Sequence, residues 1–262
     1  MINVQKYTEL EPEFFNGRNF GDSNEVVKSV LEEVQKKGDT ALRIYGQKFD
    51  VSVPAVFEVP ACELKDAAEK LKIEKRDVYD AIVYSHDLAL KFAKLQRESF
   101  TDFEKELTPG IFTGQKTIPV ENAGCYVPAG RFPLVSTVIM TVTPAVAAGV
   151  NNVIICTPPR VHPDDKVAAG KNGSGIPGKA FVGGKPYADE GIMAAAYICG
   201  VNHLYAVGGS QAIGAMAYGT ESIPKVDVIV GPGNKYVNAA KKEVFGAVGI
   251  DMLAGPTEVL VI

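Results

Sequence analysis

The sequence predicts an α/β fold: a Rossmann-like parallel sheet domain preceded by a helix-rich N-terminal region that forms part of a second α/β domain. Two observations support this prediction. After residue 121, short apolar runs rich in β-branched residues alternate with segments of helical periodicity, and most connections between them are short. The first 100 residues show helical periodicity almost throughout. Strands and helices that alternate in this way are typical of a parallel sheet.

The composition bounds the class of protein. The chain has 262 residues, enough for one large domain or two ordinary ones. A formal charge of −4 with scattered basic residues excludes the basic footprint of a nucleic-acid-binding protein. No segment reaches the roughly 18 consecutive apolar residues of a membrane span, and the acidic N-terminus differs from a signal peptide. We therefore expect a cytoplasmic protein with neither nucleic acid nor membrane as a partner.

Helices are expected first along the chain. Ser23 is a candidate N-cap for a helix that ends at Gly38, because apolar residues follow at 3.6-residue spacing. Further helices are expected over 40–49, 63–72 and 76–100, and strands with turns follow from Phe103. The expected division is a helical region over 1–120, a Rossmann-like domain over 121–255, and a return strand to the first domain that starts in 256–262.

The expected Rossmann-like domain alternates regularly except at one place. Its helices are predicted over 134–149, 189–199, 211–218 and 234–246, and its strands over 153–157, 204–207 and 227–230. A glycine- and proline-rich insertion at 161–188 separates one strand from the helix that follows it. Connections of this length are uncommon in compact domains. We expect a small surface hairpin here, with basic residues that are solvated or that reach an anionic ligand.

Three glycine-flanked turns carry the candidate chemistry: GCYVPAGR at 124–131, GGSQ at 208–211 and GPGN at 231–234. A turn from a parallel strand into a helix brings free backbone N–H groups to one edge of the sheet, where they favour a phosphate or polar ligand. Tyr126, Gln211 and Asn234 add an aromatic ring and two amides at these turns. The sequence therefore predicts one shared ligand crevice. Tight turns that bind nothing remain the alternative.

These turns also carry a resemblance to the histidinol dehydrogenase family. It rests on the blocks 124–150, 207–246 and 249–262, and on the N-terminal EEVQKKGDTALRIYGQKFD. The resemblance implies a zinc- and NAD-dependent dehydrogenase that oxidises L-histidinol through histidinal to L-histidine, acting as a homodimer. It assigns NAD contacts to Tyr126, Gln211 and Asn234, and a substrate contact to Thr257, where many members have Ser.

The resemblance also predicts what lies outside the chain. The family's zinc ligands and its proton-transfer residues belong to a segment after the one that ends here in EVLVI, so Zn²⁺ ligands are expected beyond residue 262. The three histidines and four cysteines are widely spaced and form no local zinc motif. We accordingly assign no catalytic and no metal residue within the chain, interpret it as the N-terminal portion of a longer enzyme, and expect little or no turnover from it alone.

Two alternatives remain open. Thr257 and the basic insertion favour a related NAD-dependent dehydrogenase that acts on a sulfonated diol or another polyol, since relatives with that activity share the Thr. The missing segment favours a non-catalytic module made from a truncated enzyme. In each reading with an activity, the partner is a small-molecule substrate.

Overall fold

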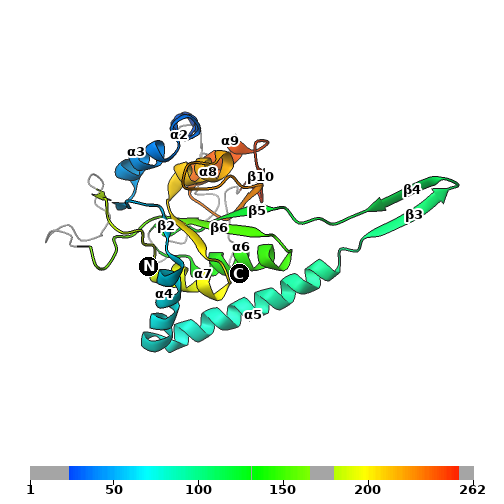
Figure 1. Cartoon of the computed structure of the whole chain (residues 1–262), viewed down its shortest axis with the longest axis horizontal. Helices are drawn as coiled ribbons and strands as arrows, with labels where there is room; N and C mark the ends of the chain where they lie inside the picture. The colour runs from blue at the N-terminus through cyan, green and yellow to red at the C-terminus, as the bar shows by residue number, and fades with distance from the viewer. Residues whose placement is uncertain (1–23, 131, 166–179, 254–262) are drawn as a thin grey trace, which may run out of the picture.

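A computed structural model describes residues 24–130, 132–165 and 180–253. At its centre is a six-stranded sheet in which the strands follow the order β10-β9-β5-β6-β8-β2 (Figure 1). These strands are β2 (Glu58–Val59), β5 (Asn122–Tyr126), β6 (Asn152–Thr157), β8 (His203–Ala206), β9 (Val228–Val230) and β10 (Gly249–Ile250). All neighbours are parallel except β2, which runs antiparallel to β8 at one edge. The predicted α/β class with a parallel sheet is confirmed.

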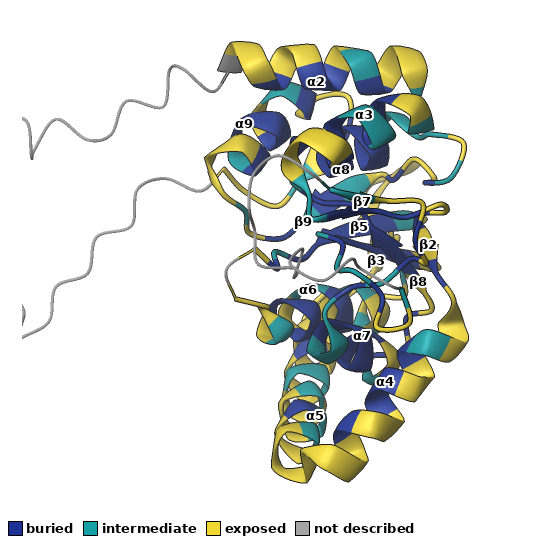
Figure 2. Cartoon of the chain, turned by 90° about the vertical axis from the view of Figure 1, so that its left-hand side faces the viewer, coloured by how far each residue is buried: buried dark blue, intermediate teal, exposed yellow. Residues whose placement is uncertain are grey.

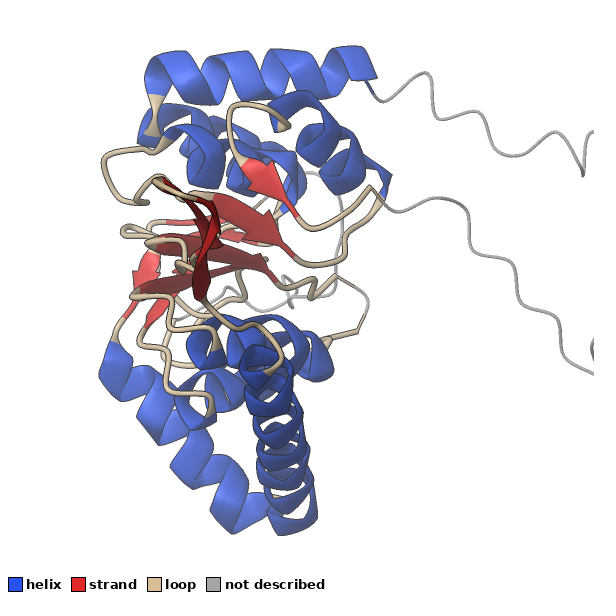
Figure 3. Ribbon diagram, turned by 90° about the vertical axis from the view of Figure 1, so that its right-hand side faces the viewer, coloured by secondary structure: helices blue, strands red, loops and turns tan. Residues whose placement is uncertain are grey.

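Helices cover both faces of the sheet, which gives three layers (Figures 2 and 3). One face carries α2 (Asn24–Lys37), α3 (Asp39–Phe49), α8 (Gly209–Tyr218) and α9 (Lys235–Val244). The other carries α4 (Ala61–Glu74), α5 (Arg76–Glu98), α6 (Val135–Ala147) and α7 (Glu190–Ile198). Each layer contributes its own buried apolar cluster, so the sheet is buried on both sides, as parallel sheets are.

The helix α2 shows how the periodicity of the sequence becomes packing. Val27, Val30, Leu31 and Val34 lie on one face of the helix, and all four are buried. That face packs on α8 at Gly214, where an added β-carbon would stand only 3.0 Å from the Leu31 side chain. Each fully buried Val or Leu contributes roughly 1.5–3 kcal/mol. The predicted N-cap, Ser23, lies outside the described residues.

The order of the strands reverses beside β5. The chain adds β6 and then β8 on one side of β5, and α8 then brings it back to place β9 on the other side. The helix α6 follows β5 on one face of the sheet, whereas α9 follows β9 on the opposite face. Such a switch point leaves a crevice beyond the carboxyl ends of the strands, where α/β proteins bind ligands.

The first hundred residues contribute to both layers. Their helices α2 and α3 pack on α8 and α9, while α4 packs on α7 and α5 packs on α6 (Figure 1). Between them, β2 adds the antiparallel edge strand to the sheet. The division into domains at 1–120 and 121–255 stays a prediction, and residues 256–262 lie outside the described part of the chain.

The insertion contributes a strand to a second, smaller sheet. Its strand β7 (Phe181–Val182) pairs in parallel with β1 (Ser52–Val53). The backbone N–H groups of Phe181 and Gly183 donate to carbonyls of residues 51 and 53, at 3.0 and 2.9 Å. Residues 51–53 thus supply a distant strand edge to the described part of the insertion, and the small surface hairpin expected within the insertion stays a prediction. Residues 166–179 lie outside the description.

A two-stranded hairpin extends from the body of the molecule beyond the end of α5 (Figure 1). Its strands β3 (Phe103–Thr108) and β4 (Ile111–Gln115) are antiparallel and exposed along their whole length. The turn uses Gly110 with φ of 83°, a conformation that favours glycine. None of the helices that the structure describes is long and apolar enough to cross a membrane.

Candidate functional site

The three predicted turns lie at one edge of the sheet, at the carboxyl ends of β5, β8 and β9. The turn after β9 approaches the end of β5 so closely that a β-carbon at Gly231 would collide with the backbone of Tyr126. The φ of 121° at Gly231 also favours glycine. The structure therefore brings the 124–131 and 231–234 turns into direct contact at the switch point.

Tyr126 links this edge to the turn after β8. Its ring lies in the core, and its hydroxyl accepts a hydrogen bond from the Gly209 N–H at 3.1 Å. Burial raises the pKa of the Tyr126 phenol above its usual range, so the hydroxyl keeps its proton. Tyr126 therefore holds the GGSQ turn from the side of the core. Its ring forms part of the core, and its assignment to NAD stays a prediction.

Gln211 lies in the first turn of α8 and is 1% exposed. Its amide nitrogen donates to the Asp50 carboxylate at 3.1 Å. Its amide oxygen is buried and finds no hydrogen-bond partner among the described residues. A buried carbonyl without a partner is unusual in a folded protein and calls for an explanation.

Asp50 is the site residue that sequence reasoning missed. It directly follows α3 and reaches the end of the sheet, although it is 161 residues away from Gln211 in the sequence. Burial of the carboxyl raises the pKa of Asp50 to about 7, and the hydrogen bond from Gln211 partly offsets this effect. Its position as the last residue of the N-terminal block, after KF, was the one available signal.

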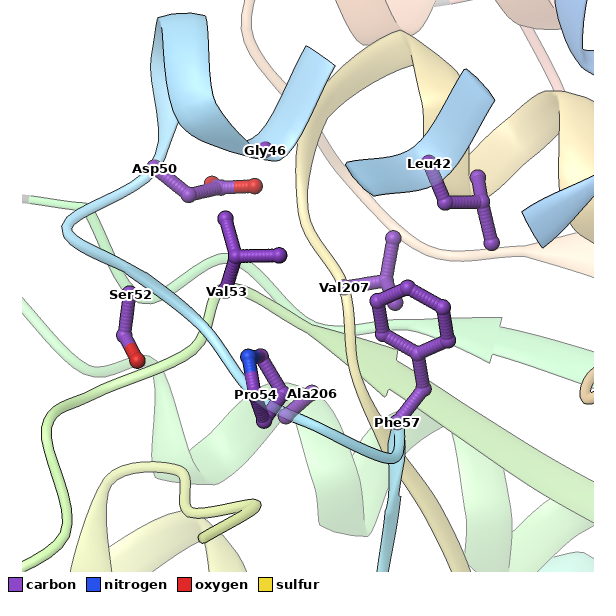
Figure 4. A pocket seen from close by; sticks show the side chains of 9 residues that line it. All are labelled: Leu42, Gly46, Asp50, Ser52, Val53, Pro54, Phe57, Ala206 and Val207. Carbon is purple, nitrogen blue, oxygen red and sulfur yellow. The ribbon is translucent and has the colours of Figure 1, made fainter. Parts of the chain in front are cut away.

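Asp50 also lines a shallow pocket between α3 and the end of β8, which has no room for a water molecule. Figure 4 shows the polar side chains of Asp50 and Ser52 on one side of this pocket and Leu42 and Phe57 on the other. The Ser52 hydroxyl is buried and lacks a partner within the described ranges. The carboxyl of Asp50 thus lies between an apolar wall and the glycine turn.

Asn234 is exposed and caps α9. Its side-chain oxygen accepts hydrogen bonds from the N–H groups of Tyr236 and Val237, at 3.0 and 3.1 Å. This is a standard use of Asn at a helix start. Asn234 thus caps α9 in the structure, while its assignment to NAD stays a prediction.

An ion pair between the buried Lys241 and the more exposed Asp251 holds the GPGN turn in place. The ammonium group of Lys241, which is 2% exposed, pairs with Asp251 and also donates to the Gly231 carbonyl at 2.9 Å. The other Asp251 carboxylate oxygen accepts from the Gly231 N–H, also at 2.9 Å. Both backbone groups of Gly231 are therefore fixed by side chains that come from α9 and from just after β10.

The expectation of free backbone N–H groups at these helix starts is wrong at four positions. Each of these groups donates to a side chain of the protein. They belong to Gly209, Gly231, Tyr236 and Val237. The reason is that tyrosine and aspartate oxygens from other elements reach the first two of these groups, while the local cap residue Asn234 accepts from the other two. The amide oxygen of Gln211, by contrast, has no partner among the described residues and stays a candidate for recognising a ligand at this edge.

The described residues do not form a metal site. No three His, Cys, Asp or Glu side chains among them are placed to hold an ion. Each histidine instead lies beside carboxylates: His86 by Asp87, His162 by Glu63 and Asp164, and His203 by Glu58. Thr257, the predicted substrate contact, lies outside the described residues.

Comparison with known proteins identifies the family. The family model described as histidinol dehydrogenase matches residues 16–185 and 182–262. The chain belongs to the histidinol dehydrogenase family. It is 40% identical to the histidinol dehydrogenase of Methanocaldococcus jannaschii over 99% of this chain and 55% of that protein. It is 39% identical to the sulfopropanediol 3-dehydrogenase of Ruegeria pomeroyi over 92% of this chain and 49% of that protein.

A solved structure is similar throughout the chain. The crystal structure of histidinol dehydrogenase from Elizabethkingia anophelis superposes with a TM-score of 0.74 at 32% identity, and covers 97% of this chain and 50% of that one. The chain thus spans about half the length of the relatives it matches. The relatives named here are dehydrogenases.

Proposed function

We propose that this chain supplies the NAD-binding part of a zinc- and NAD-dependent L-histidinol dehydrogenase, which oxidises histidinol through histidinal to L-histidine. Family membership supports the reaction class. The observation that carries the NAD assignment is the meeting of the predicted turns at the β5/β9 switch point, beside the unpartnered amide oxygen of Gln211. NAD, when bound, supplies the hydride acceptor.

The described residues fit NAD through binding and orientation. Gln211 offers a buried amide oxygen, and Tyr126 holds the turn on which Gln211 stands. Asn234 and the exposed Pro232 mark the open side of the GPGN turn. A crevice fixed by such contacts presents its polar groups in one arrangement, so that little reorganisation is needed on binding. The described residues do not form a zinc site, and the zinc ligands are expected beyond residue 262.

A binding experiment tests the NAD assignment without requiring turnover. The purified chain is titrated with NADH while the nucleotide fluorescence is followed. We expect saturable binding that Gln211→Leu weakens about 10-fold, the equivalent of one lost hydrogen bond of about 1.4 kcal/mol. The exposed Glu32→Ala on α2 is the control and leaves the affinity unchanged. Absence of saturable binding by the wild-type chain contradicts the assignment.

A second substrate class is favoured by a specific observation. The similarity to a sulfopropanediol 3-dehydrogenase equals that to the histidinol dehydrogenases, at 39% against 40% identity. Thr257 points the same way. The test is turnover of the full-length protein on L-histidinol and on 2,3-dihydroxypropane-1-sulfonate under identical conditions. A strong preference for the sulfonate would show that the sulfonated diol, and not histidinol, is the substrate. A strong preference for histidinol would reject this alternative.

We also propose that the protein works as a homodimer. Large apolar side chains are exposed along α5 at helical spacing and continue into the hairpin. They are Tyr84, Leu88, Phe92, Leu95, Phe103, Leu107, Ile111 and Phe112. An isolated two-stranded hairpin is only marginally stable in water, so these strands need a surface to pack on. Size-exclusion chromatography with light scattering measures the mass, and a monomer at all concentrations contradicts the proposal.

A further inference from the structure

We propose that Asp50 is a positioning residue: it orients the Gln211 amide so that the amide oxygen accepts a hydrogen bond from a donor group of NAD. The donor is either the 2′-hydroxyl of the nicotinamide ribose or the carboxamide N–H of the nicotinamide. This inference rests on the proposed NAD function. Asp50 is thereby added to the site, and the group of NAD that contacts Gln211 is a hydrogen-bond donor.

The first step concerns the orientation of the amide. The Gln211 side chain turns its amide nitrogen, which only donates, toward an oxygen of the Asp50 carboxyl at 3.1 Å, and that oxygen accepts whether the carboxyl is ionised or carries its proton on the other oxygen. The amide oxygen must then point the other way. It is this oxygen that is buried without a partner in the described part of the chain, although Gln211 is 1% exposed.

The second step concerns the space beside that oxygen. A β-carbon at Gly209 would stand 2.7 Å from the Gln211 oxygen, closer than van der Waals contact allows. Any other side chain at residue 209 would therefore cover the amide. The φ of 67° at Gly209 suits glycine as well. Glycine at residue 209 thus leaves the buried amide oxygen in place, because no side chain there displaces it.

The third step concerns the ligand group. An acceptor oxygen repels the oxygens of a phosphate or carboxylate, and attracts a hydroxyl or an N–H. The Gly209 N–H, which would otherwise favour a phosphate, already donates to Tyr126. The amide oxygen of Gln211 therefore suits a ribose or carboxamide donor of NAD and disfavours its pyrophosphate.

The experiment compares two variants of Asp50 in the purified chain. Asp50→Ala removes the acceptor that orients the amide, and we expect NADH affinity to fall about 10-fold. Asp50→Asn keeps a side-chain oxygen that accepts from the Gln211 nitrogen, so affinity stays within about 3-fold of the wild type. Ser52→Ala is the matched control: Ser52 lines the same pocket, and its hydroxyl is buried as well.

Two NAD analogues identify the donor. The 3-acetylpyridine analogue replaces the carboxamide NH₂ by a methyl group, and a 2′-deoxy analogue lacks one hydroxyl of the nicotinamide ribose. We expect one of them to bind the wild type about 10-fold more weakly than NAD, and to lose nothing further in Asp50→Ala. If both analogues bind as well as NAD, or if Asp50→Ala binds NADH normally, the inference is overturned.

A ligand-free measurement separates this failure from that of the proposed function. The side-chain NH₂ signals of Gln211, identified by their loss in Gln211→Leu, are expected to shift in Asp50→Ala and to return in Asp50→Asn. A wild-type chain that shows this coupling yet binds no NADH refutes the NAD function, and the donor assignment with it. If NADH binds normally but the Gln211 signals do not change in Asp50→Ala, only the positioning role of Asp50 is refuted.

Discussion

The carboxyl edge of the sheet and the hairpin beyond α5 use polar and apolar groups in opposite ways. At the edge, the backbone of Gly231 and the amide of Gln211 are held by side chains from other elements, and the amide oxygen of Asn234 is held by backbone N–H groups of α9. In the hairpin, every residue of β3 and β4 is exposed, apolar ones included. The edge is thus organised by this chain alone, whereas the hairpin presents a surface that has no counterpart within the described chain.

The largest expected effect comes from breaking the support of the GPGN turn. Asp251→Ala leaves the ammonium group of Lys241 buried without its counter-charge. We expect the free energy of unfolding, measured with urea, to fall by about 3–5 kcal/mol. Glu32→Ala removes an exposed pair with Lys36 and costs at most about 0.5 kcal/mol. Equal effects of the two changes would mean that the pair of Lys241 and Asp251 does not organise the edge.

The pH dependence of stability tests the burial of Asp50. The pKa of its carboxyl rises from 3.8 to about 7 on folding, so the folded state holds this proton more tightly than the unfolded state. Stability from this group is full below pH 4 and is lost as the pH rises toward 7, by roughly 2–4 kcal/mol. Asp50→Asn has no carboxyl that titrates in this range, so its stability does not fall for this reason as the pH rises.

The stabilities of the wild type and of Asp50→Asn are compared as a function of pH. Urea titrations from pH 4 to pH 8 should show the stability advantage of Asp50→Asn over the wild type growing from near zero to a few kcal/mol, or roughly 2–4 on the same basis. If the two free energies of unfolding change in parallel across this pH range, the Asp50 carboxyl is solvated and its pKa is not raised by burial.

A substitution in the hairpin sharpens the contrast from the other side. Phe112 is 62% exposed, so Phe112→Glu is expected to leave the free energy of unfolding of the isolated subunit within about 0.5 kcal/mol of the wild type. Self-association, measured by sedimentation equilibrium, is expected to weaken about 100-fold. Glu104→Gln on the same hairpin is the control. An unchanged association constant would remove the hairpin from the interface.

The smallest effect is expected at the exposed cap of α9. Asn234→Ala removes the acceptor for two N–H groups and is expected to lower the free energy of unfolding by about 1 kcal/mol. Asn234→Asp keeps a side-chain oxygen and restores the stability. Thermal unfolding of the three proteins measures this difference. If Asn234→Ala is as stable as the wild type, the cap is dispensable.

Local patterns predicted the elements well. The periodicity of Val27, Val30, Leu31 and Val34 gave α2, and the glycine turns marked where β8 and β9 end. These features depend on residues that are neighbours in sequence, which is why a single sequence contains them.

Contacts between distant residues were beyond the sequence. The bond from Gln211 to Asp50 joins residues 161 apart, and the strands β1, β2 and β7 are two residues long and show no alternation. The occupied N–H groups of the turns could not be foreseen either, because the residues that bind Gly231, namely Asp251 and Lys241, approach it only in the folded sheet.

The packing of α2 on α8 has a consequence for how the chain is made. The partner of Leu31 is Gly214, and the Asp39 N–H donates to the Glu221 carboxylate at 2.7 Å. During synthesis, the amphipathic surface of the first helices therefore emerges from the ribosome long before the residues that cover it. Folding must wait for the second half of the chain, and loop closure over some 180 residues makes that step slow. Nascent chains of intermediate length are then the species most exposed to chaperones and to aggregation.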